Sequence, residues 1–388
     1  MKIAIAGGVR LHALLPLLER RAHNDAAFLG LGSAAAPATS IALGLHERGH
    51  DLVVIGLQVG LAAGKRFTGE RISVHVGPYR PRHRARDLFK VERAYIRSVL
   101  EQEQPDIVHA NWSYENALGA LATDLPVLVT VRDWAPKVLR LYADPYRAAR
   151  FVMNAWTLAR ARHLTAPSPY IATKVHRWLR RPVRVVPNAL DDADFTPGPR
   201  PCPTAPNTLV AMNNGFSKLK NVTCLLKAFS IVRQKLPGTR LHLIGPDYEE
   251  GGSADQWAQR HALSGGVSFE GPVPYGSVST ALRGADVFVH PSLEESFGTV
   301  VVQAMAQGVP VVAGRRSGAI PWVLADGEAG LLVDVQSPKA LAGGIVSLLN
   351  DAVLWRQLAR AGFERAHGSF RASIAINRYL EAYADVLS

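Results

Sequence analysis

The sequence predicts an α/β protein made of two Rossmann-like, doubly wound domains. Short apolar, β-branched segments alternate with longer amphipathic segments along most of the chain, which is typical of parallel sheets with crossover helices. The chain has 388 residues, more than the roughly 250–300 that a single core accommodates. The segment Pro187–Pro203, rich in Pro and Asp, interrupts the alternation at the midpoint, so we expect the domain boundary there.

Each predicted strand is a short, buried apolar run. Four such runs lie in the first half, at Lys2–Ala6, Asp51–Leu57, Asp106–Ala110 and Pro126–Val131. Five lie in the second half, at Thr208–Met212, Leu241–Ile244, Asp286–His290, Pro310–Ala313 and Gly330–Val333. The amphipathic segments between them predict helices at Ala38–Arg48, Phe89–Glu103, Leu219–Lys235 and Thr299–Gln307. Ligands of such sheets bind beyond the carboxyl ends of the strands, so we expect the two domains to face each other across a cleft.

The charge is unevenly distributed along the chain. Residues 1–190 contain 27 Lys and Arg against 14 Asp and Glu, a net charge of +13, whereas residues 191–388 carry −1. The densest basic segment, residues 65–97, has a net charge of +7 and four interleaved aromatic residues. It is either a solvated basic surface or a surface that attracts anionic lipid or saccharide. Each basic residue close to an anionic leaflet contributes about 1 kcal/mol of binding free energy. No nucleic-acid-binding motif accompanies it, so nucleic acid is not an expected partner.

The sequence favours a cytoplasmic protein. Cys202 and Cys224 are the two cysteines, so no disulfide framework is expected and a reducing compartment is the natural one. The initial MKIAIAGG lacks the features of a signal peptide, and no apolar run approaches the ~20 residues of a membrane span. We expect residues 65–97 to be the surface through which the protein would associate peripherally with the inner face of the cytoplasmic membrane.

The segment 290–310, HPSLEESFGTVVVQAMAQGVP, contains a predicted anion site. A strand is expected to end at His290, and Gly298 and Thr299 to open a helix whose first N–H groups attract an anion. Glu295 precedes these groups, and Gln303 follows it by eight residues, about two helical turns. Glu295 either binds a hydroxylated ligand beside a phosphate or stabilises the dipole of its own helix.

A second segment, Met212–Val222 (MNNGFSKLKNV), also runs from a strand through a glycine-containing loop into a helix. Lys218 and Lys220 lie in that loop. Lysines at such a position either bind phosphate as point charges or are simply solvated.

Taken together, these segments resemble the retaining glycosyltransferases of family 4, which have the GT-B fold. The resemblance covers residues 160–350 well and residues 1–160 in outline. It is carried by the order of the Lys220 loop, LLKAFSIVRQKLPGTRLHLIG, FEGPVP, ADVFVHPSLEESFG, AMAQGVPVVAG and DGEAGLLV, with VVPNALDDADFTP at 185–197 as the inter-domain motif. It implies an acceptor-binding domain at 1–190, a nucleotide-sugar-binding domain at 191–370, and a C-terminal helix in 371–388, about Ala372–Leu387, that returns to the first domain.

The resemblance also implies roles for residues of the second half. Glu295 takes the first position of the family's Glu–x7–Glu signature and would contact hydroxyls of the donor sugar. Gln303 stands at the second position, which holds the ribose, but an amide cannot make the charge-assisted bond of a carboxylate. Lys220 matches the diphosphate lysine. The family's arginine falls on Gly215, so Lys218 would supply the second charge. Other donor contacts are expected at the phosphate from Phe297, Gly298 and Thr299, and at the ribose and base from Val273 and Pro274.

In the first half the resemblance is weaker. Gly30–Ser33 looks like the family's glycine loop, in which Gly32 would approach the donor phosphate, although a lone Gly-x-Gly also fits an ordinary turn. Arg132 and Asp133 stand where many relatives have a histidine; Arg132 would bind an anionic acceptor and Asp133 would orient an acceptor hydroxyl. His109 and Trp112 either contact the acceptor sugar or are a structural histidine and a core tryptophan.

The resemblance to family 4 implies a retaining hexosyltransferase that needs no metal ion. Its donor would be a nucleoside-diphosphate sugar, UDP- or GDP-linked, and its acceptor a hydroxyl of a glycan, glycolipid or small metabolite. Glu295, Lys220 and Asp133 are the predicted catalytic residues. Motifs of metal sites, serine hydrolases, P-loops and dinucleotide-binding turns are absent from the sequence. The alternative is a catalytically weak or inactive nucleotide-sugar-binding scaffold protein with the same fold.

Overall fold

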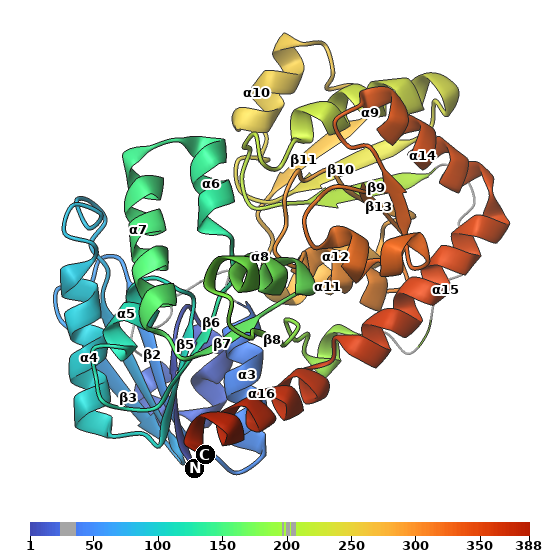
Figure 1. The fold of residues 1–388 in the computed structure, drawn as a ribbon. Helices are drawn as coiled ribbons and strands as arrows, with labels where there is room; N and C mark the ends of the chain where they lie inside the picture. Colours follow the sequence, from blue (N-terminus) through green and yellow to red (C-terminus); the bar gives the residue numbers. More distant parts are fainter. Residues whose placement is uncertain (24–35, 196–197, 199–201, 203–206) are drawn as a thin grey trace. The chain divides into compact units, whose positions relative to one another are not determined.

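A computed structural model describes residues 1–23, 36–195, 198, 202 and 207–388. The chain forms two compact units. Unit 1 comprises Met1–Ala189 and Ala372–Ser388, and unit 2 comprises Leu190–Arg371. The chain therefore passes between the units twice, and the two passages lie side by side, because the Leu190 N–H donates to the Phe370 carbonyl oxygen over 3.0 Å. Each unit contains one sheet (Figure 1), and the predicted α/β class is confirmed.

The sheet of unit 1 has eight strands in the order β3-β4-β2-β1-β5-β6-β7-β8, and only β3 pairs antiparallel. The strands are β1 (Lys2–Ala6), β2 (Asp51–Gln58), β3 (Lys65–Gly69), β4 (Ile72–Pro78), β5 (Ile107–Asn111), β6 (Val127–Thr130), β7 (His163–Ala166) and β8 (Arg184–Val185). The basic segment 65–97 thus begins with an edge hairpin, β3–β4, which the sequence analysis did not predict.

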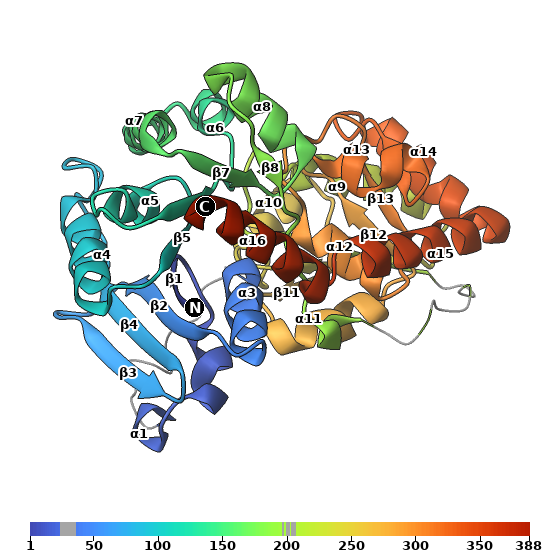
Figure 2. The same ribbon diagram turned by 60° about the horizontal axis from the view of Figure 1, so that its bottom comes forward.

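Alternating residues of these strands face two different cores. Ile3 and Ile5 of β1 lie in a core covered by α3 and α16, whereas Ala4 and Ala6 face the core under α4 and α5. Figure 2 shows α3 and α16 on one face of this sheet and α4 and α5 on the other. Burying each aliphatic side chain contributes roughly 1.5–3 kcal/mol, so this period-2 alternation fixes both the register and the doubly wound topology.

The helices of unit 1 follow the predicted alternation. They are α1 (Arg20–His23), α3 (Ala36–Glu47), α4 (Lys90–Glu103), α5 (Glu115–Ala120), α6 (Ala135–Tyr142), α7 (Pro145–Arg160), α8 (Pro169–Leu179) and α16 (Ala372–Leu387), with a 3-10 turn at Leu11–Leu17. The helix expected from Phe89 begins one residue later, because Phe89 has a left-handed backbone with φ of 61°.

Unit 2 has a six-stranded, wholly parallel sheet in the order β11-β10-β9-β12-β13-β14. Its strands are β9 (Thr208–Met212), β10 (Arg240–Ile244), β11 (Val267–Gly271), β12 (Val287–His290), β13 (Val311–Gly314) and β14 (Leu331–Val333). The chain starts at the central strand β9, winds outward through β10 and β11, and then returns to pair β12 with the other side of β9. The strand order therefore reverses between β9 and β12.

Helices cover both faces of the sheet of unit 2. They are α9 (Val222–Lys235), α10 (Ser253–Arg260), α11 (Tyr275–Arg283), α12 (Thr299–Ala306), α13 (Ile320–Val323), α14 (Pro338–Asn350) and α15 (Ala352–Ser369), with 3-10 turns at Asp192–Asp194 and Ala325–Gly327. Leu209 and Ala211 of β9 face the core under α9 and α14, whereas Val210 lies in the core with α11 and α12.

The last helix, α16, is part of unit 1 although the chain reaches it from unit 2. It packs against α3, β5 and β6, as both ribbon views show (Figures 1 and 2). Tyr379 and Tyr383 on its inner face are buried. The C-terminal segment therefore completes the core of the first unit.

Candidate functional site

The carboxyl edge of the sheet in unit 2 brings two loops together. Lys220 lies in the loop that connects β9 to α9, and Glu295 in the loop that connects β12 to α12. Because β9 and β12 are neighbours whose following helices cover opposite faces of the sheet, these loops flank the point where the strand order reverses. Open α/β sheets bind their ligands at such a point.

Lys220 and Glu295 form a largely buried ion pair there. The Lys220 ammonium donates to Glu295 Oε1 over 2.6 Å, and the two side chains are 18% and 15% exposed. His290, at the end of β12 and 1% exposed, donates from Nε2 to the same oxygen over 3.1 Å. Glu295 Oε2 receives no hydrogen bond from any residue that the structure describes. This oxygen is the acceptor that a ligand hydroxyl would find in the cluster.

The cluster holds Glu295 ionised. Burial raises the pKa of the Glu295 carboxyl, but the charge of Lys220 and the hydrogen bond from His290 outweigh this effect, and the pKa lies well below its ordinary value of 4.5. The site therefore presents a carboxylate and an ammonium side by side at neutral pH.

The next loop supports Glu295 from behind. The Ala319 N–H donates to the Glu295 carbonyl oxygen over 2.9 Å, and Ser317 Oγ donates to the Ser292 carbonyl oxygen over 2.5 Å. Gly318 has φ of 63°, and a Cβ there would collide with the Glu295 carbonyl oxygen. A residue with a side chain at this position would thus push the Glu295 loop out of place.

Two amides near this edge have buried atoms without hydrogen-bond partners in the described structure. Gln303, on α12, is 5% exposed, and its Nε2 has no partner. Asn213, directly after β9, is 7% exposed, and neither its Nδ2 nor its Oδ1 has one. Buried polar atoms are nearly always paired, so these two amides are candidates for ligand contacts. The sequence analysis predicted Gln303 as a site residue but not Asn213.

The other predicted donor-site residues differ in what they expose. Lys218 is exposed on the loop of Lys220. Gly298 caps α12 with φ of 90°, and Thr299 is the first residue of this helix. The Phe297 side chain is fully buried against Phe370, so only the backbone of Phe297 is left to contact a ligand. Val273 packs on the core and Pro274 caps α11. Gly215, where the resemblance expects arginine, has φ of 89°.

In unit 1, His109 is a fully buried structural residue. Its Nδ1 shares a hydrogen bond of 2.9 Å with the Tyr383 hydroxyl of α16, and its Nε2 one of 2.6 Å with Thr130 Oγ1. Burial lowers the pKa of His109 to about 3. Because both ring nitrogens are engaged and the residue is 0% exposed, we leave His109 out of the acceptor site proposed below.

Arg132 lies near His109 at the same edge of the sheet. Its Nε donates to Asn111 Oδ1 over 2.5 Å and its Nη1 donates to Asn188 Oδ1. Burial lowers the pKa of this guanidinium, and no carboxylate among the described residues forms an ion pair with it. Gly32 lies outside the described residues.

Trp112 and Asp133, which follow β5 and β6, line one pocket of about 210 Å³ in unit 1. Trp112 is 38% exposed. Asp133 Oδ1 accepts a hydrogen bond of 2.8 Å from the Tyr114 hydroxyl, and burial raises the pKa of its carboxyl. Tyr114, Tyr146 and Arg150, which sequence reasoning missed, also line this pocket, together with Ala135, Val138 and Arg147. They lie up to 38 positions from Trp112, and no local pattern joins them.

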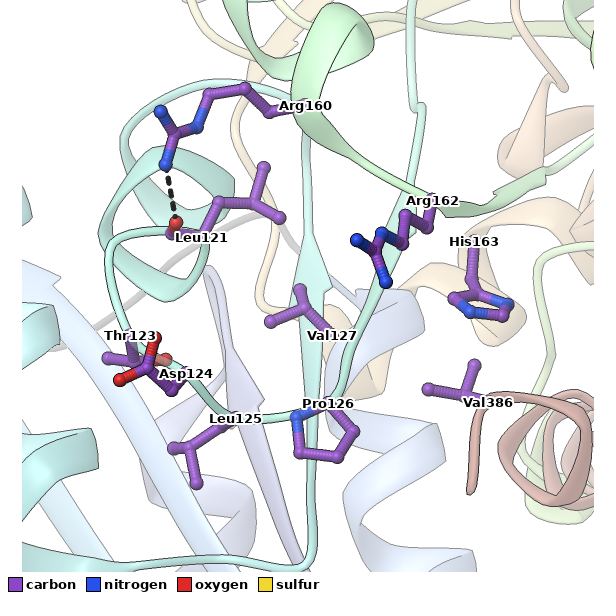
Figure 3. A pocket seen from close by; sticks show the side chains of 10 residues that line it. All are labelled: Leu121, Thr123, Asp124, Leu125, Pro126, Val127, Arg160, Arg162, His163 and Val386. Atoms are coloured by element: carbon purple, nitrogen blue, oxygen red, sulfur yellow. Dashed lines mark hydrogen bonds between the residues drawn. The ribbon is translucent and has the colours of Figure 1, made fainter. Parts of the chain in front are cut away.

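A larger pocket, of about 450 Å³, opens at the opposite edge of the same sheet. Figure 3 shows Arg160, Arg162 and His163 around it, with Val386 of the C-terminal segment. Arg160 donates to the Leu121 carbonyl oxygen over 3.0 Å. This pocket adjoins the amino ends of β6 and β7, where α/β sheets do not bind their substrates, and none of the predicted site residues lines it.

Within the described residues no group of three His, Cys, Asp or Glu side chains is arranged to hold a metal ion. The helices described here are also too short or too polar to cross a bilayer.

Comparison with known proteins follows the division into two units. The family model for glycosyltransferase family 4 matches residues 38–194, and the model for glycosyl transferases group 1 matches residues 201–365. The chain is 31% identical over 269 residues to the lipopolysaccharide core biosynthesis glycosyltransferase LpsE of Rhizobium meliloti, an alignment that covers 65% of this chain and 74% of LpsE.

Solved structures with the same fold span the whole chain. Sucrose-phosphate synthase from Thermosynechococcus elongatus superposes with a TM-score of 0.80 at 20% identity, covering 100% of this chain and 99% of that one. Anabaena HepE, in complex with UDP and glucose, superposes with a TM-score of 0.70 at 19% identity, covering 99% and 100%.

Proposed function

The chain belongs to glycosyltransferase family 4 and has the GT-B fold, and from this premise we propose that it is a retaining hexosyltransferase. Its donor is a nucleoside-diphosphate sugar, UDP- or GDP-linked, and its acceptor is a hydroxyl of a glycan, glycolipid or small metabolite. The observation that supports this proposal most strongly is the buried Lys220–Glu295–His290 cluster at the point where the strand order of unit 2 reverses. The UDP-bound relative HepE supports a nucleotide-sugar donor.

In this proposal Lys220 stabilises the leaving diphosphate. Departure of the diphosphate leaves an oxocarbenium-like sugar and builds negative charge on the phosphate oxygens. Lys220, the exposed Lys218 and the N–H groups at Gly298 and Thr299 lie in the loops that follow β9 and β12. One donor aimed at such developing charge is typically worth ~3–4 kcal/mol of barrier. These groups supply the positive charge at the leaving phosphate, so we propose that no metal ion is required.

Glu295 binds hydroxyls of the donor sugar in the same scheme. Among the described residues, both hydrogen bonds to its carboxylate fall on Oε1, so Oε2 is the oxygen that would accept from the sugar. Gln303 offers its Nε2, which lacks a partner among the described residues, to the ribose. Val273 and Pro274 lie in the loop after β11, where we place the base.

The acceptor site lies in unit 1 in this proposal. Asp133, whose carboxylate lies at the wall of a pocket with Trp112, orients the acceptor hydroxyl. Arg132 contributes a cation that forms no ion pair within the described structure. The leaving phosphate takes the proton of the acceptor hydroxyl, so the scheme requires no protein base.

Peripheral membrane binding through residues 65–97 is a further part of the proposal. The structure neutralises several basic residues of this segment, since carboxylates pair with Arg66, Arg80 and Arg97. In the described structure no carboxylate pairs with the side chains of Arg82, Arg86 and Lys90, which are exposed around the start of α4. These three are the residues that would face an anionic leaflet.

Flotation with vesicles tests this part. We expect the wild type to bind vesicles that contain phosphatidylglycerol and to dissociate as salt rises, because the attraction is electrostatic. Replacing Arg82, Arg86 and Lys90 by alanine should weaken binding several-fold. A matched control replaces three exposed basic residues of unit 2, Lys235, Arg240 and Arg260. Equal loss in both triple variants, or no binding by the wild type, would contradict peripheral binding through 65–97.

The catalytic proposal is tested by turnover of candidate donors. The chain is incubated with UDP- and GDP-sugars, with and without bacterial glycan or glycolipid acceptors, and nucleotide release is measured together with the anomeric configuration of the product by NMR. We expect release that requires Lys220 and a product with retained configuration. An inverted product would refute the retaining mechanism. Nucleotide binding without any turnover would favour the inactive scaffold protein.

A further inference from the structure

We infer that the pocket formed by Trp112, Tyr114, Asp133, Tyr146, Arg147 and Arg150 binds one uncharged pyranose or cyclitol ring of the acceptor, stacked on Trp112 and Tyr146. This pocket is called the aromatic pocket below. The inference rests on the proposed function, which places the acceptor in unit 1. It adds the chemical class of the bound ring and the aromatic residues Tyr114 and Tyr146 to the acceptor site.

The position and size of the aromatic pocket suit a single sugar ring. It lies beyond the carboxyl ends of β5 and β6, the edge at which doubly wound sheets bind ligands. Its volume is about 210 Å³, below the ~300–1,000 Å³ of pockets for drug-sized ligands. It can therefore enclose one ring of an acceptor while the rest of a longer glycan stays outside.

The walls of the pocket are aromatic. Trp112 and Tyr114 stand with ring centroids 5.8 Å apart and planes tilted by 58°, and Tyr146, in the first turn of α7, also lines the pocket. Aromatic side chains that combine an apolar face with a polar handle suit the apolar faces of sugar rings. Trp112, 38% exposed, presents such a face to solvent.

The charges in the pocket are compensated by the protein itself. The Arg150 guanidinium pairs with Glu115 over 2.6 Å and lies 3.5 Å from the centroid of the Tyr114 ring. Arg147 lies 3.5 Å from Asp144 and covers Tyr146 at 5.0 Å. Because each arginine already has a carboxylate and an aromatic partner, the pocket offers no uncompensated cation. The geometry therefore favours a neutral ring over a sugar acid or sugar phosphate.

Asp133 and the backbone at Trp112 fix how a ring would be held. Asp133 accepts from the Tyr114 hydroxyl through Oδ1, and the Trp112 side chain also hydrogen-bonds to this carboxylate, so both aromatic residues hold Asp133 at the pocket wall, where a hydroxyl of the ring would meet it. Trp112 has φ of 114°, rare for a residue with a large side chain, and its N–H donates to the Thr130 carbonyl oxygen over 3.1 Å. Such strained residues concentrate at ligand sites, and here the unusual backbone directs the indole into the pocket wall.

A binding experiment tests the inference without needing turnover. Saturation-transfer NMR on the full chain uses methyl α-mannopyranoside, methyl α-glucopyranoside and myo-inositol as neutral probes, and methyl glucuronide and glucose 6-phosphate as charged probes. We expect saturation of ring protons for at least one neutral probe and at least tenfold weaker binding of its charged analogue. No signal from any neutral probe, or preference for a charged one, would overturn the inference.

Variants identify the pocket as the site of binding. Tyr146→Ala should weaken the binding of the probe at least tenfold and raise the acceptor KM by a similar factor. Tyr146→Phe, which keeps the aromatic ring, should keep both values close to those of the wild type. The matched control is Tyr142→Ala, since Tyr142 also stacks on Arg147, at 4.8 Å, but lies outside the pocket. Unchanged probe binding in Tyr146→Ala would refute the assignment.

A nucleotide readout separates this inference from the proposed function. UDP or GDP binding and acceptor-independent donor hydrolysis by the wild type report on unit 2, the donor side of the proposed function, and not on the aromatic pocket. If the wild type shows neither nucleotide binding nor donor hydrolysis but still binds a neutral probe, the proposed transferase function is refuted and the aromatic pocket is not. Normal donor turnover together with no probe binding would refute the aromatic pocket alone.

Discussion

Removing one partner of the Lys220–Glu295 pair should destabilise unit 2 more than removing both. Lys220→Met leaves the Glu295 carboxylate largely buried, with His290 as its remaining partner in the part of the chain that the structure describes, and leaving one charge of a buried pair unpaired costs about 3–5 kcal/mol. The two side chains keep 18% and 15% of their surface exposed, so we expect a smaller loss of about 2–3 kcal/mol. Glu295→Gln should cost about 1–3 kcal/mol, because Lys220 and His290 then lose a charged acceptor.

The double variant Lys220→Met/Glu295→Gln contains neither charge and should lie within about 1 kcal/mol of the wild type, because no buried charge is left without a partner. Hydrogen exchange on peptides that cover residues 208–222 and 287–303 measures the opening free energy of unit 2 separately from unit 1. Transfer should be reduced at least 100-fold in all three variants. If the double variant is as unstable as Lys220→Met, the charge-pair explanation is wrong.

The same pair determines how unit 2 responds to acid. Because the folded-state pKa of Glu295 lies below its ordinary value of 4.5, the ionised carboxylate stabilises the fold above pH 4.5, and this stabilisation is lost as the pH falls from there towards the folded-state pKa. Glu295→Gln should remove this part of the acid sensitivity. An unchanged slope of stability below pH 4.5 would contradict the assignment.

Two further predictions concern backbone and pH. Gly318→Ala should cost about 1–2 kcal/mol of stability, because Gly318 has a left-handed backbone, and it should reduce transfer because the new Cβ displaces Glu295. The control is Gly343→Ala, on a helix face where a Cβ meets nothing within 4 Å, which should leave transfer unchanged. Equal transfer activities of the two variants would contradict the role of Gly318. The pKa of His109 is about 3 in the fold, against an ordinary value of 6.5. The free energy of unfolding of unit 1 should therefore fall by about 1 kcal/mol between pH 7.5 and 5.5, because the unfolded chain binds a proton at His109 in this range and the folded chain does not. Hydrogen exchange should show that His109→Gln removes this slope, and a slope that persists in the variant would rule out His109 as its source.

The sequence predicted those features of the fold that depend on local patterns. Strands such as Thr208–Met212 and Lys2–Ala6 are short, continuous apolar runs, and the structure places β9 and β1 at these bounds. The edge hairpin β3–β4 was not predicted. Charged residues such as Lys65 and Arg66 interrupt the apolar pattern of β3, whereas β4 has a short apolar run that the sequence analysis did not interpret as a strand.

The site was predictable where it is carried by loops at strand ends. Lys220 and Glu295 were chosen from separate motifs, and their direct contact depends on the adjacency of β9 and β12, which only the sheet order reveals. His290 was recognised as a strand end but not as a partner of Glu295. Sequence reasoning left His109 open between acceptor contact and structure, since its engagement by Tyr383, 274 positions away, has no local signal.

The walls of the aromatic pocket illustrate the same limit. Trp112 was chosen as an aromatic residue near a predicted strand end, and Asp133 because its segment stands where many relatives have a histidine. Tyr146 and Arg150 lie on α7 and reach the pocket through tertiary packing. A helical residue that faces a ligand has the same sequence pattern as one that faces the core, so periodicity alone does not distinguish them.

The most direct test of the central claim is calorimetric titration of the chain with UDP, GDP, ADP and dTDP in the presence of EDTA. The stable double variant Lys220→Met/Glu295→Gln serves as the comparison, because its loss of binding would not reflect unfolding. We predict micromolar binding of one nucleotide, UDP or GDP, that the double variant weakens at least tenfold. Equal binding by the two proteins, or binding of no nucleotide by the wild type, would contradict a donor site at Lys220 and Glu295.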